Sequence, residues 1–314
     1  MPISLIPWFK LEAWEIPFPF IGTLPLQPFG LLVAIGILFG SRIAEWRADK
    51  TDVPRHLVND FLVHVILIGG LLCMFFNVLF YEPDKFAAMG RAVASWFQDG
   101  PNEPFPYPGL SSFGGFFGGT LAALWFRHKR RVSLMVLGDI FCFAFPFAWI
   151  FCRSGCFVVH DHPGVVSDFF LAVDNYYGEG QPRHDLGLYE VIWAIVMVPI
   201  VLWLARKPRP RGFFMAFVPI VYAPIRFGLD FLRETEVHGG DVRYFGLTPG
   251  HYAAIALLLA GIGVAIRVAR GPQPTLMLPG APPVPEDPAV AAAGSDADKK
   301  VKVRPAARSK QRAK

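Results

Sequence analysis

Long apolar runs separated by short polar segments occupy most of this 314-residue chain. A membrane-spanning helix needs about 17–25 mostly apolar residues, and seven runs reach or approach that length. They cover residues 25–42, 58–81, 110–126, 134–158, 187–205, 213–232 and 251–268. The pattern predicts an all-α polytopic membrane protein with about seven transmembrane helices.

Lysine and arginine are unevenly distributed over the connections between these runs. Residues 42–57, 127–133 and 206–212 each carry four basic residues, and the alternate connections carry one or two. Basic residues favour the cytoplasmic side of a membrane. The N-terminus is therefore expected outside the membrane and the C-terminus in the cytoplasm.

Composition divides the chain into three parts. Residues 1–24 lack the basic region and cleavage site of a removable signal peptide and are expected to form a periplasmic segment. Residues 25–270 form the predicted seven-helix transmembrane domain. From residue 271 the sequence is rich in Pro, Ala and Lys, which predicts a disordered, basic cytoplasmic tail. That tail is either simply solvated or touches anionic headgroups.

Charge and cysteine usage narrow the function classes. The chain is 53% hydrophobic and only 18% charged, with a net charge of +5. Because the basic residues follow membrane topology, we expect membrane lipids and no nucleic acid as partners. The four cysteines all lie within or at the end of apolar runs, so a disulfide framework is not expected.

The fourth apolar run ends in CRSGCFVVHDHP, residues 152–163. Cys152, Cys156 and His160 are spaced to share one helix face. A thiol–thiol–imidazole row could hold zinc or copper, but this spacing is unusual and buried cysteine is common as a small hydrophobe. We therefore expect no metal and no cofactor.

Three further stretches carry unusual residues for a membrane. SSFGGFFGGT, residues 111–120, either approaches a phosphate or lets two helices pack closely. PRHDLGLYE, residues 182–190, places charged groups where an outer connection enters the fifth run. VYAPIRFGLDFLRE, residues 221–234, sets a polar stripe on an apolar helix, formed by Tyr222, Arg226, Asp230 and Arg233.

Several arginines and histidines thus gather towards the outer half of the membrane. Ionisable residues inside a membrane are costly and commonly functional, although pairing of Arg226 with Asp230 could be purely structural. Arginine binds phosphate through two parallel hydrogen bonds, and anionic phospholipids are the phosphates at hand. The residues indicate a lipid-headgroup site with acid–base groups nearby.

These motifs resemble the prolipoprotein diacylglyceryl transferase family over most of residues 24–268. SSFGGFFGG is similar to its HGG motif, CRSGCF to G-R-x-G-N-F, and RHDLGLYE to R-H-x-x-Q-L-Y-E. YAPIRFGLDFLRE is similar to Y-G-x-x-R-F-x-x-E-x-x-R-E, and GLTPGH to G-L-T-x-G-Q. NVLFYEP, residues 77–83, is similar to the family's segment after its second helix.

The resemblance implies an enzyme of the bacterial inner membrane, with its active site towards the periplasm. It would transfer diacylglycerol from phosphatidylglycerol to the lipobox cysteine thiol of a prolipoprotein, releasing glycerol 1-phosphate without a metal. Arg153 and Arg226 would bind the phosphate, and Asp230 would orient Arg226. The other implied substrate-binding residues are Gly114, Gly115, Gly155, Tyr189, Glu190 and Arg233.

The chain also departs from the family pattern. Phe113 stands at the histidine of HGG, Cys156 at the signature asparagine, and Val159 and Phe29 at two further polar positions. An arginine usual in the second helix is missing. We hypothesise that acid–base chemistry has moved to other residues, namely His160, Asp161, His162 and His184.

Two other functions remain open from the sequence. A non-canonical paralogue could bind phosphatidylglycerol but use another acceptor, or assist lipoprotein traffic without catalysis. A small-molecule transporter would be expected to show an internal repeat, and none is apparent.

Overall fold

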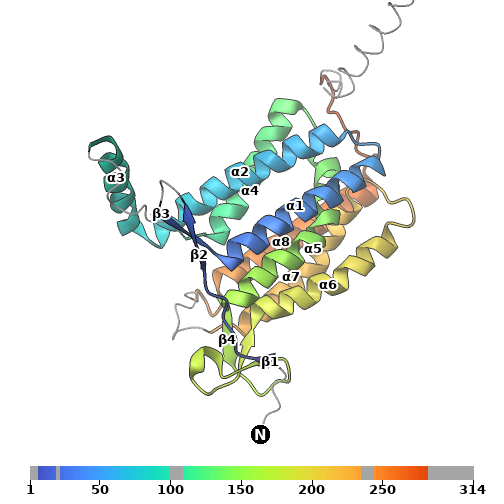
Figure 1. The fold of residues 1–314 in the computed structure, drawn as a ribbon. Helices are drawn as coiled ribbons and strands as arrows, with labels where there is room; N and C mark the ends of the chain where they lie inside the picture. The colour runs from blue at the N-terminus through green and yellow to red at the C-terminus, as the bar shows by residue number, and fades with distance from the viewer. Residues whose placement is uncertain (1–5, 19–21, 99–108, 235–242, 282–314) are drawn as a thin grey trace, which may run out of the picture.

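The computed structural model of the protein describes residues 6–18, 22–98, 109–234 and 243–281. Within these ranges the fold is mainly helical (Figure 1). The helices are α1 (Pro28–Asp49), α2 (Arg55–Phe80), α3 (Pro83–Gln98), α4 (Ser112–Arg130), α5 (Leu134–Val159), α6 (Leu186–Leu204), α7 (Phe213–Phe231) and α8 (Pro249–Arg270).

The polytopic, helical membrane class is confirmed. Six of the described helices are long and apolar enough to cross a membrane, namely all except α3 and α4. Helix α4 is the third predicted run, and its glycines and its basic last turn make it less apolar than the others. The exact number of spans and the orientation of the termini stay predictions.

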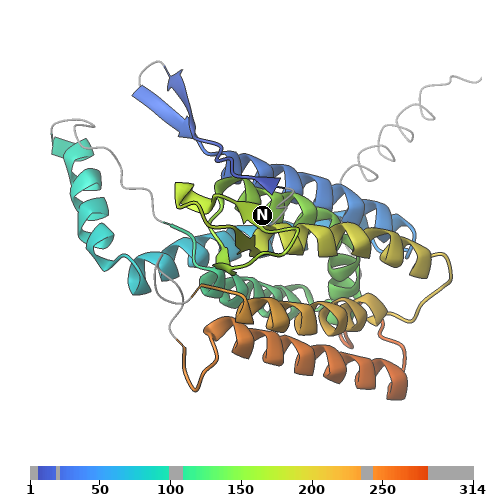
Figure 2. The same cartoon turned by 90° about the horizontal axis from the view of Figure 1, so that it is seen from below.

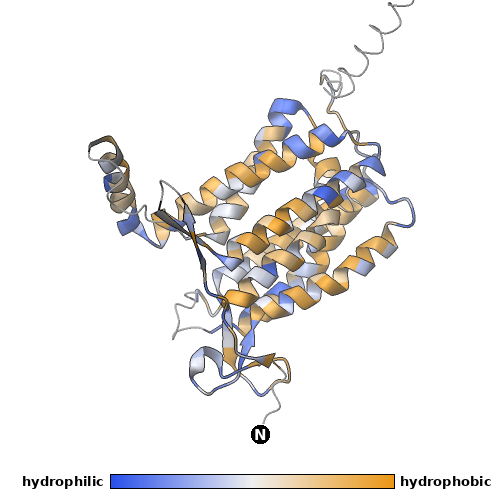
Figure 3. Cartoon of the chain, viewed as in Figure 1, coloured by the Kyte–Doolittle hydropathy of each residue, from blue (hydrophilic) through white to orange (hydrophobic). Residues whose placement is uncertain are grey.

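The helices pack in pairs along a common bundle. Helix α1 lies along α5, α5 also contacts α6 and α7, α7 lies along α8, and α2 lies along α4. Figure 2 shows the α7–α8 pair along one side of the bundle, with α3 set apart from it. Figure 3 shows apolar residues along the helices and polar residues concentrated at both ends of the bundle.

The glycine-rich start of α4 is a packing surface. A Cβ atom on Gly118 would lie 2.8 Å from Cβ of Leu72 and 2.9 Å from Cα of Gly69 on α2. A Cβ on Gly114 would collide with the Leu72 carbonyl oxygen. These contacts support the helix-packing alternative for this stretch and explain why its positions need glycine.

A buried carboxylate fixes α7 against α5. Asp139 of α5 accepts a hydrogen bond of 2.6 Å from the backbone N–H of Phe214, in the first turn of α7. The guanidinium group of Arg47, from α1, lies 4.9 Å from the ring centre of Phe143 and 5.1 Å from that of Phe214. A carboxylate at a helix N-terminus satisfies otherwise unpaired N–H groups, so these contacts set the relative position of the two helices.

Short strands cover the end of the bundle that lies away from the contact between Asp139 and Phe214. The apolar pattern of the sequence did not predict these strands. A four-stranded sheet has the order β1 (Ile6–Pro7), β5 (Val173–Asp174), β6 (Arg183–Asp185) and β4 (Pro163–Val166). A separate hairpin joins β2 (Trp14–Phe18) to β3 (Gly22–Leu26). Strands β1 and β5 come from segments far apart in the chain, so local sequence gives little sign of their pairing.

The first residues after α8 fold back onto the bundle. Ser133 donates its backbone N–H to the Leu276 carbonyl at 2.8 Å, and Leu278 donates to the Arg131 carbonyl at 2.8 Å. Met277 forms a β-bridge with Val132. The prediction that disorder begins at residue 271 is therefore wrong for 271–281, where backbone pairing orders the chain. The remainder of the expected tail, 282–314, lies outside the described residues.

Candidate active site

Four helix ends bring the main polar cluster together. Arg153 lies near the C-terminus of α5, Glu190 near the N-terminus of α6, Arg226 and Asp230 near the C-terminus of α7, and His251 near the N-terminus of α8. All four ends lie at the same end of the bundle as the short sheet (Figure 1).

Glu190 connects the two central arginines. Its carboxylate, with only 2% of the side chain exposed, lies 2.9 Å from Arg153 Nε and 3.9 Å from Arg226 Nε. It also accepts hydrogen bonds from Trp149 Nε1 at 3.0 Å and from the Tyr222 hydroxyl at 2.5 Å. The Trp149 ring lies under the Arg153 guanidinium, 4.6 Å from its centre. A carboxylate held by four partners fixes the arginines from α5 and α7 relative to one another.

Asp230 also holds Arg226, the arginine on α7. Its fully buried carboxylate lies 2.7 Å from Arg226 Nη1 and 4.0 Å from Arg233 Nη1. The Thr248 hydroxyl donates to it, and His251 Nδ1 lies 3.4 Å away. This geometry agrees with the expected role of Asp230 in orienting Arg226.

The arginine side chains of the cluster are partly exposed. Those of Arg153, Arg226 and Arg233 are 13%, 17% and 19% exposed, whereas their two carboxylate partners are almost completely buried. Three guanidinium groups thus face two buried carboxylates, and the residual charge of this group is positive. Such an arrangement suits a singly charged phosphodiester.

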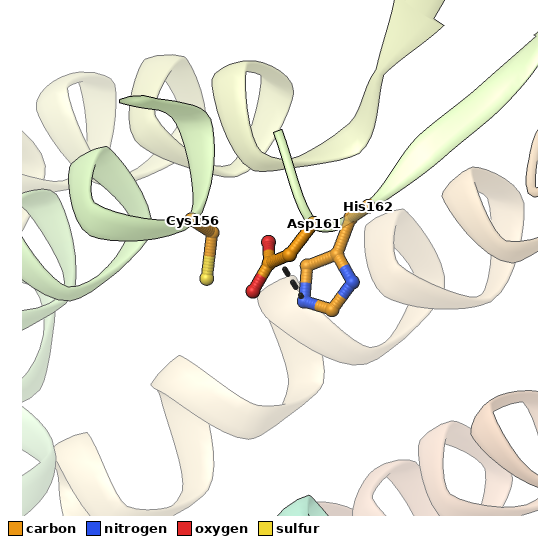
Figure 4. Close-up of side chains that lie close together, drawn as sticks. All are labelled: Cys156, Asp161 and His162. Carbon is orange, nitrogen blue, oxygen red and sulfur yellow. Dashed lines mark ion pairs between the residues drawn. The ribbon is translucent and has the colours of Figure 1, made fainter. Parts of the chain in front are cut away.

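A second cluster lies beside Arg153. Helix α5 ends at Val159, and His160 adopts a left-handed backbone conformation with φ of 52° and ψ of 47°. This turn redirects the chain, so that Asp161 and His162 come back to Cys156, as Figure 4 shows. Ligand atoms of the three side chains all lie within 4.8 Å of one another, and Arg153 Nη1 lies 3.5 Å from Cys156 Sγ.

The electrostatic surroundings tie this cluster to the arginines. Burial raises the pKa of Asp161 to about 6, although Arg153 opposes the shift. Burial lowers the pKa of His162 well below its usual value, and the positive charges of Arg153, Arg233 and Arg226 lower it further. The positive charge of the arginine cluster therefore acts on both residues.

His160 lies apart from this site, and its expected catalytic role is not supported. Its side chain is completely buried, and Nδ1 lies 2.7 Å from Asp185 Oδ2. The Trp8 ring stacks on the imidazole with centres 4.3 Å apart. Tyr176 donates to the same carboxylate at 3.1 Å, and burial raises the pKa of this tyrosine. The predicted row of Cys152, Cys156 and His160 on one helix face does not form, because the helix ends before His160.

Four other expected site residues make local side-chain contacts or helix-packing contacts. His184 contacts the Tyr189 hydroxyl through Nδ1, and burial lowers the pKa of its imidazole. A Cβ on Gly155 would lie 3.2 Å from the Phe29 carbonyl oxygen, so Gly155 allows α1 and α5 to approach closely. Gly114 and Gly115 face α2. Among the described contacts, none links these four residues to the arginines.

Sequence reasoning missed three supporting residues. Trp149 precedes Arg153 by one helical turn, so helix periodicity could have indicated it. Thr248 and His251 form a capping box at the start of α8, with His251 donating its backbone N–H to Thr248 and accepting from it through Nδ1. Their link to Asp230 depends on the packing of α7 against α8, which the sequence does not reveal.

Comparison with known proteins identifies the family. The sequence profile described as prolipoprotein diacylglyceryl transferase matches residues 16–267. The chain belongs to the prolipoprotein diacylglyceryl transferase family. The matched region includes all four helix ends that form the arginine cluster, so the cluster is part of the family domain.

Individual relatives agree in name and in coverage. A phosphatidylglycerol–prolipoprotein diacylglyceryl transferase of Chromohalobacter salexigens is 28% identical over 258 residues, covering 80% of this chain and 91% of the relative. The protein of that name in Bordetella bronchiseptica is 28% identical, covering 81% and 95%. That of Pseudomonas aeruginosa is 28% identical, covering 78% and 90%. This diacylglyceryl transferase family member therefore aligns with nearly the full length of these relatives.

The burial of His160 predicts a structural role that can be measured. His160→Ala leaves Asp185 without its imidazole partner and removes the stacking surface of Trp8. We expect a loss of about 3 kcal/mol in the free energy of unfolding. The melting temperature in detergent should fall by about 5 °C or more, whereas His128→Ala, at an exposed position, should leave it unchanged. Equal melting of both variants would contradict the structural role.

Proposed function

We propose that the protein transfers the diacylglyceryl group of phosphatidylglycerol to the thiol of a prolipoprotein lipobox cysteine, releasing glycerol 1-phosphate. The observation that carries this proposal is the arginine cluster, which Glu190 and Asp230 orient at one end of a membrane bundle. The names of the similar proteins support the same donor and acceptor.

Arg153 and Arg226 are the proposed phosphate ligands. Each is held by a buried carboxylate, so its guanidinium is positioned before the lipid arrives. As the glyceryl carbon–oxygen bond breaks, negative charge grows on the departing phosphate. Fixed positive groups stabilise that charge without having to reorganise during the reaction. Arg233, on the same face of α7, adds to the positive potential.

The acceptor thiol is proposed to enter beside Arg153. A thiol must lose its proton to become an effective nucleophile. Cys156, Asp161 and His162 lie next to the arginine that holds the donor phosphate. This juxtaposition supports a thiol position from which sulfur can reach the glyceryl carbon.

We propose that the site faces the periplasm across a bacterial inner membrane. The basic connections 42–57, 127–133 and 206–212 would then be cytoplasmic, as their charge favours. The arginine cluster lies at the opposite end of the bundle, together with the sheet.

A paralogue that binds phosphatidylglycerol without lipobox transfer remains the second candidate. It is favoured by Phe113 and Cys156, which replace polar residues of the family pattern while the arginines persist. A protein that retains the lipid but yields no lipidated product would support it.

Replacing a phosphate ligand tests the enzymatic proposal. Wild-type protein should produce the mass shift of a lipidated reporter prolipoprotein in a bacterium depleted of its own transferase. Arg226→Lys keeps the charge but loses the two-pronged geometry, so we expect kcat/KM to fall about 100-fold or more. Arg206→Lys, at an exposed position near the other end, should retain activity. Absence of product from well-inserted wild-type protein would overturn the transferase proposal.

The orientation can be tested by cysteine labelling. Asp174→Cys, at the exposed second position of strand β5, should react with a membrane-impermeant maleimide on intact spheroplasts. Lys207→Cys, in an exposed basic connection, should react only after permeabilisation. The protein without either substitution is the control, because it measures any labelling of the native cysteines. The reverse pattern would contradict the proposed topology.

A further inference from the structure

The four acid–base candidates predicted from the sequence lie in different surroundings. The side chain of His160 is completely buried, and the described contacts of His184 do not include the arginines. The arginine cluster acts on His162, and its positive charge opposes the formation of an imidazolium ion there. Asp161 differs from these histidines, because its carboxylate loses a charge when it accepts a proton.

Asp161 is accessible and lies beside the arginine cluster. Its side chain is 41% exposed, so a substrate group can reach it, whereas the neighbouring Cys156 is buried. A carboxylate oxygen of Asp161, Cys156 Sγ and a ring nitrogen of His162 all lie within 4.8 Å of one another (Figure 4). Arg153 Nη1 lies 3.5 Å from the same sulfur. The fold therefore already places one sulfur atom beside both this carboxylate and a proposed phosphate ligand.

The backbone fixes the position of Asp161. Its N–H donates to the Cys156 carbonyl at 3.4 Å, directly after the left-handed turn at His160. On its other side, the His162 carbonyl accepts from the backbone N–H of Leu186 at 3.2 Å, and β4 begins with the next residue. Asp161 is thus held between the end of α5 and the sheet that covers this end of the bundle.

The charges around Asp161 suit a group that exchanges a proton near neutral pH. Burial raises the pKa of Asp161 to about 6, and the Arg153 charge and the Cys156 side chain oppose that rise. A base is most effective when its pKa lies near the operating pH. The charged or titratable groups that act on this carboxylate or on the adjoining His162 are Arg153, Cys156, Asp185, Tyr176, Tyr177, Arg226 and Arg233.

Taking the proposed function as given, we infer that Asp161 is the general base that accepts the proton of the lipobox thiol. The sulfur then forms a bond to the glyceryl carbon while the carbon–oxygen bond to phosphate breaks. The electron pair of that broken bond leaves on the phosphate oxygen, so the phosphate gains one negative charge. The proton on Asp161 passes to the departing phosphate, which restores the carboxylate for the next cycle.

The charge balance of the site favours this transfer. Moving a proton from a thiol to a carboxylate leaves the net charge unchanged and shifts the negative charge to sulfur. A thiolate beside guanidinium groups is stabilised by their positive charge. The arginines that bind the donor phosphate thus also favour ionisation of the acceptor.

Replacing the carboxylate by an amide tests the role of Asp161. Asp161→Asn keeps the size of the side chain but cannot accept the proton. With full-length protein in phosphatidylglycerol liposomes and a lipobox peptide, we expect its kcat at pH 7 to fall about 100-fold or more. Asp161→Glu retains a carboxylate and should recover part of the activity. Asp168→Asn is the matched control, because Asp168 is an exposed aspartate at the same end of the chain's bundle. Wild-type activity in Asp161→Asn would overturn the inference.

The pH dependence distinguishes a base from a carboxylate with only a structural role. The kcat/KM of the wild type should fall below about pH 6, because protonated Asp161 cannot accept the thiol proton. Above about pH 8.5 a free thiol ionises without help, so the deficit of Asp161→Asn should shrink about tenfold or more between pH 7 and pH 9. A selenocysteine peptide, which ionises more readily, should reduce the deficit at pH 7. A deficit that is equal at every pH and for both peptides would overturn the role as base.

Thiol alkylation separates this inference from the proposed function. Iodoacetamide reacts with thiolates, so wild-type protein should accelerate alkylation of the lipobox peptide and Asp161→Asn should not, as measured from the peptide mass. If this difference is found but no thioether forms from phosphatidylglycerol, Asp161 ionises the thiol and the transferase proposal fails. If lipidation proceeds and neither reaction depends on Asp161, the transferase proposal stands and this inference fails.

Discussion

The pairing of buried carboxylates with arginines is the constraint on which the site depends. Glu190 and Asp230 are almost completely inaccessible, and an unpaired charge there would be strongly destabilising. Glu190 is satisfied by guanidinium groups together with the neutral donors Trp149 and Tyr222, and Asp230 by guanidinium groups together with Thr248. Arg153 and Arg226 are consequently held in fixed positions while remaining partly exposed, which is the property needed to receive a phosphate.

This pairing joins α5, α6 and α7, and the contacts of Thr248 and His251 with Asp230 add α8. The rest of the fold must hold those four helices in place. The Asp139 contact to the first turn of α7 fixes that helix against α5 at the other end of the bundle. Glycines allow close approach between α2 and α4 and between α1 and α5. On the outer side, Trp8 and Asp185 enclose His160, where the backbone turns towards Asp161 and His162. Structural residues at both ends thus support the arrangement of the polar cluster.

The sequence predicted those parts that follow from helix geometry. The helix boundaries and the stripe of Tyr222, Arg226 and Asp230 were within reach because spacing along one helix determines which side chains share a face. The ion pair of Arg153 with Glu190 could not be predicted, because it depends on how α5 packs against α6. The row of Cys152, Cys156 and His160 on one helix face was predicted wrongly, because the helical periodicity was extended past Val159, where the backbone becomes left-handed.

A cryo-electron-microscopy map of the full chain in phosphatidylglycerol nanodiscs would test the central claim most directly. The account predicts headgroup density with its phosphate between the guanidinium groups of Arg153 and Arg226, and loss of that density in Arg226→Lys. A phosphate bound at the Gly114–Gly119 stretch instead, with the arginines contacting only Glu190 and Asp230, would contradict it.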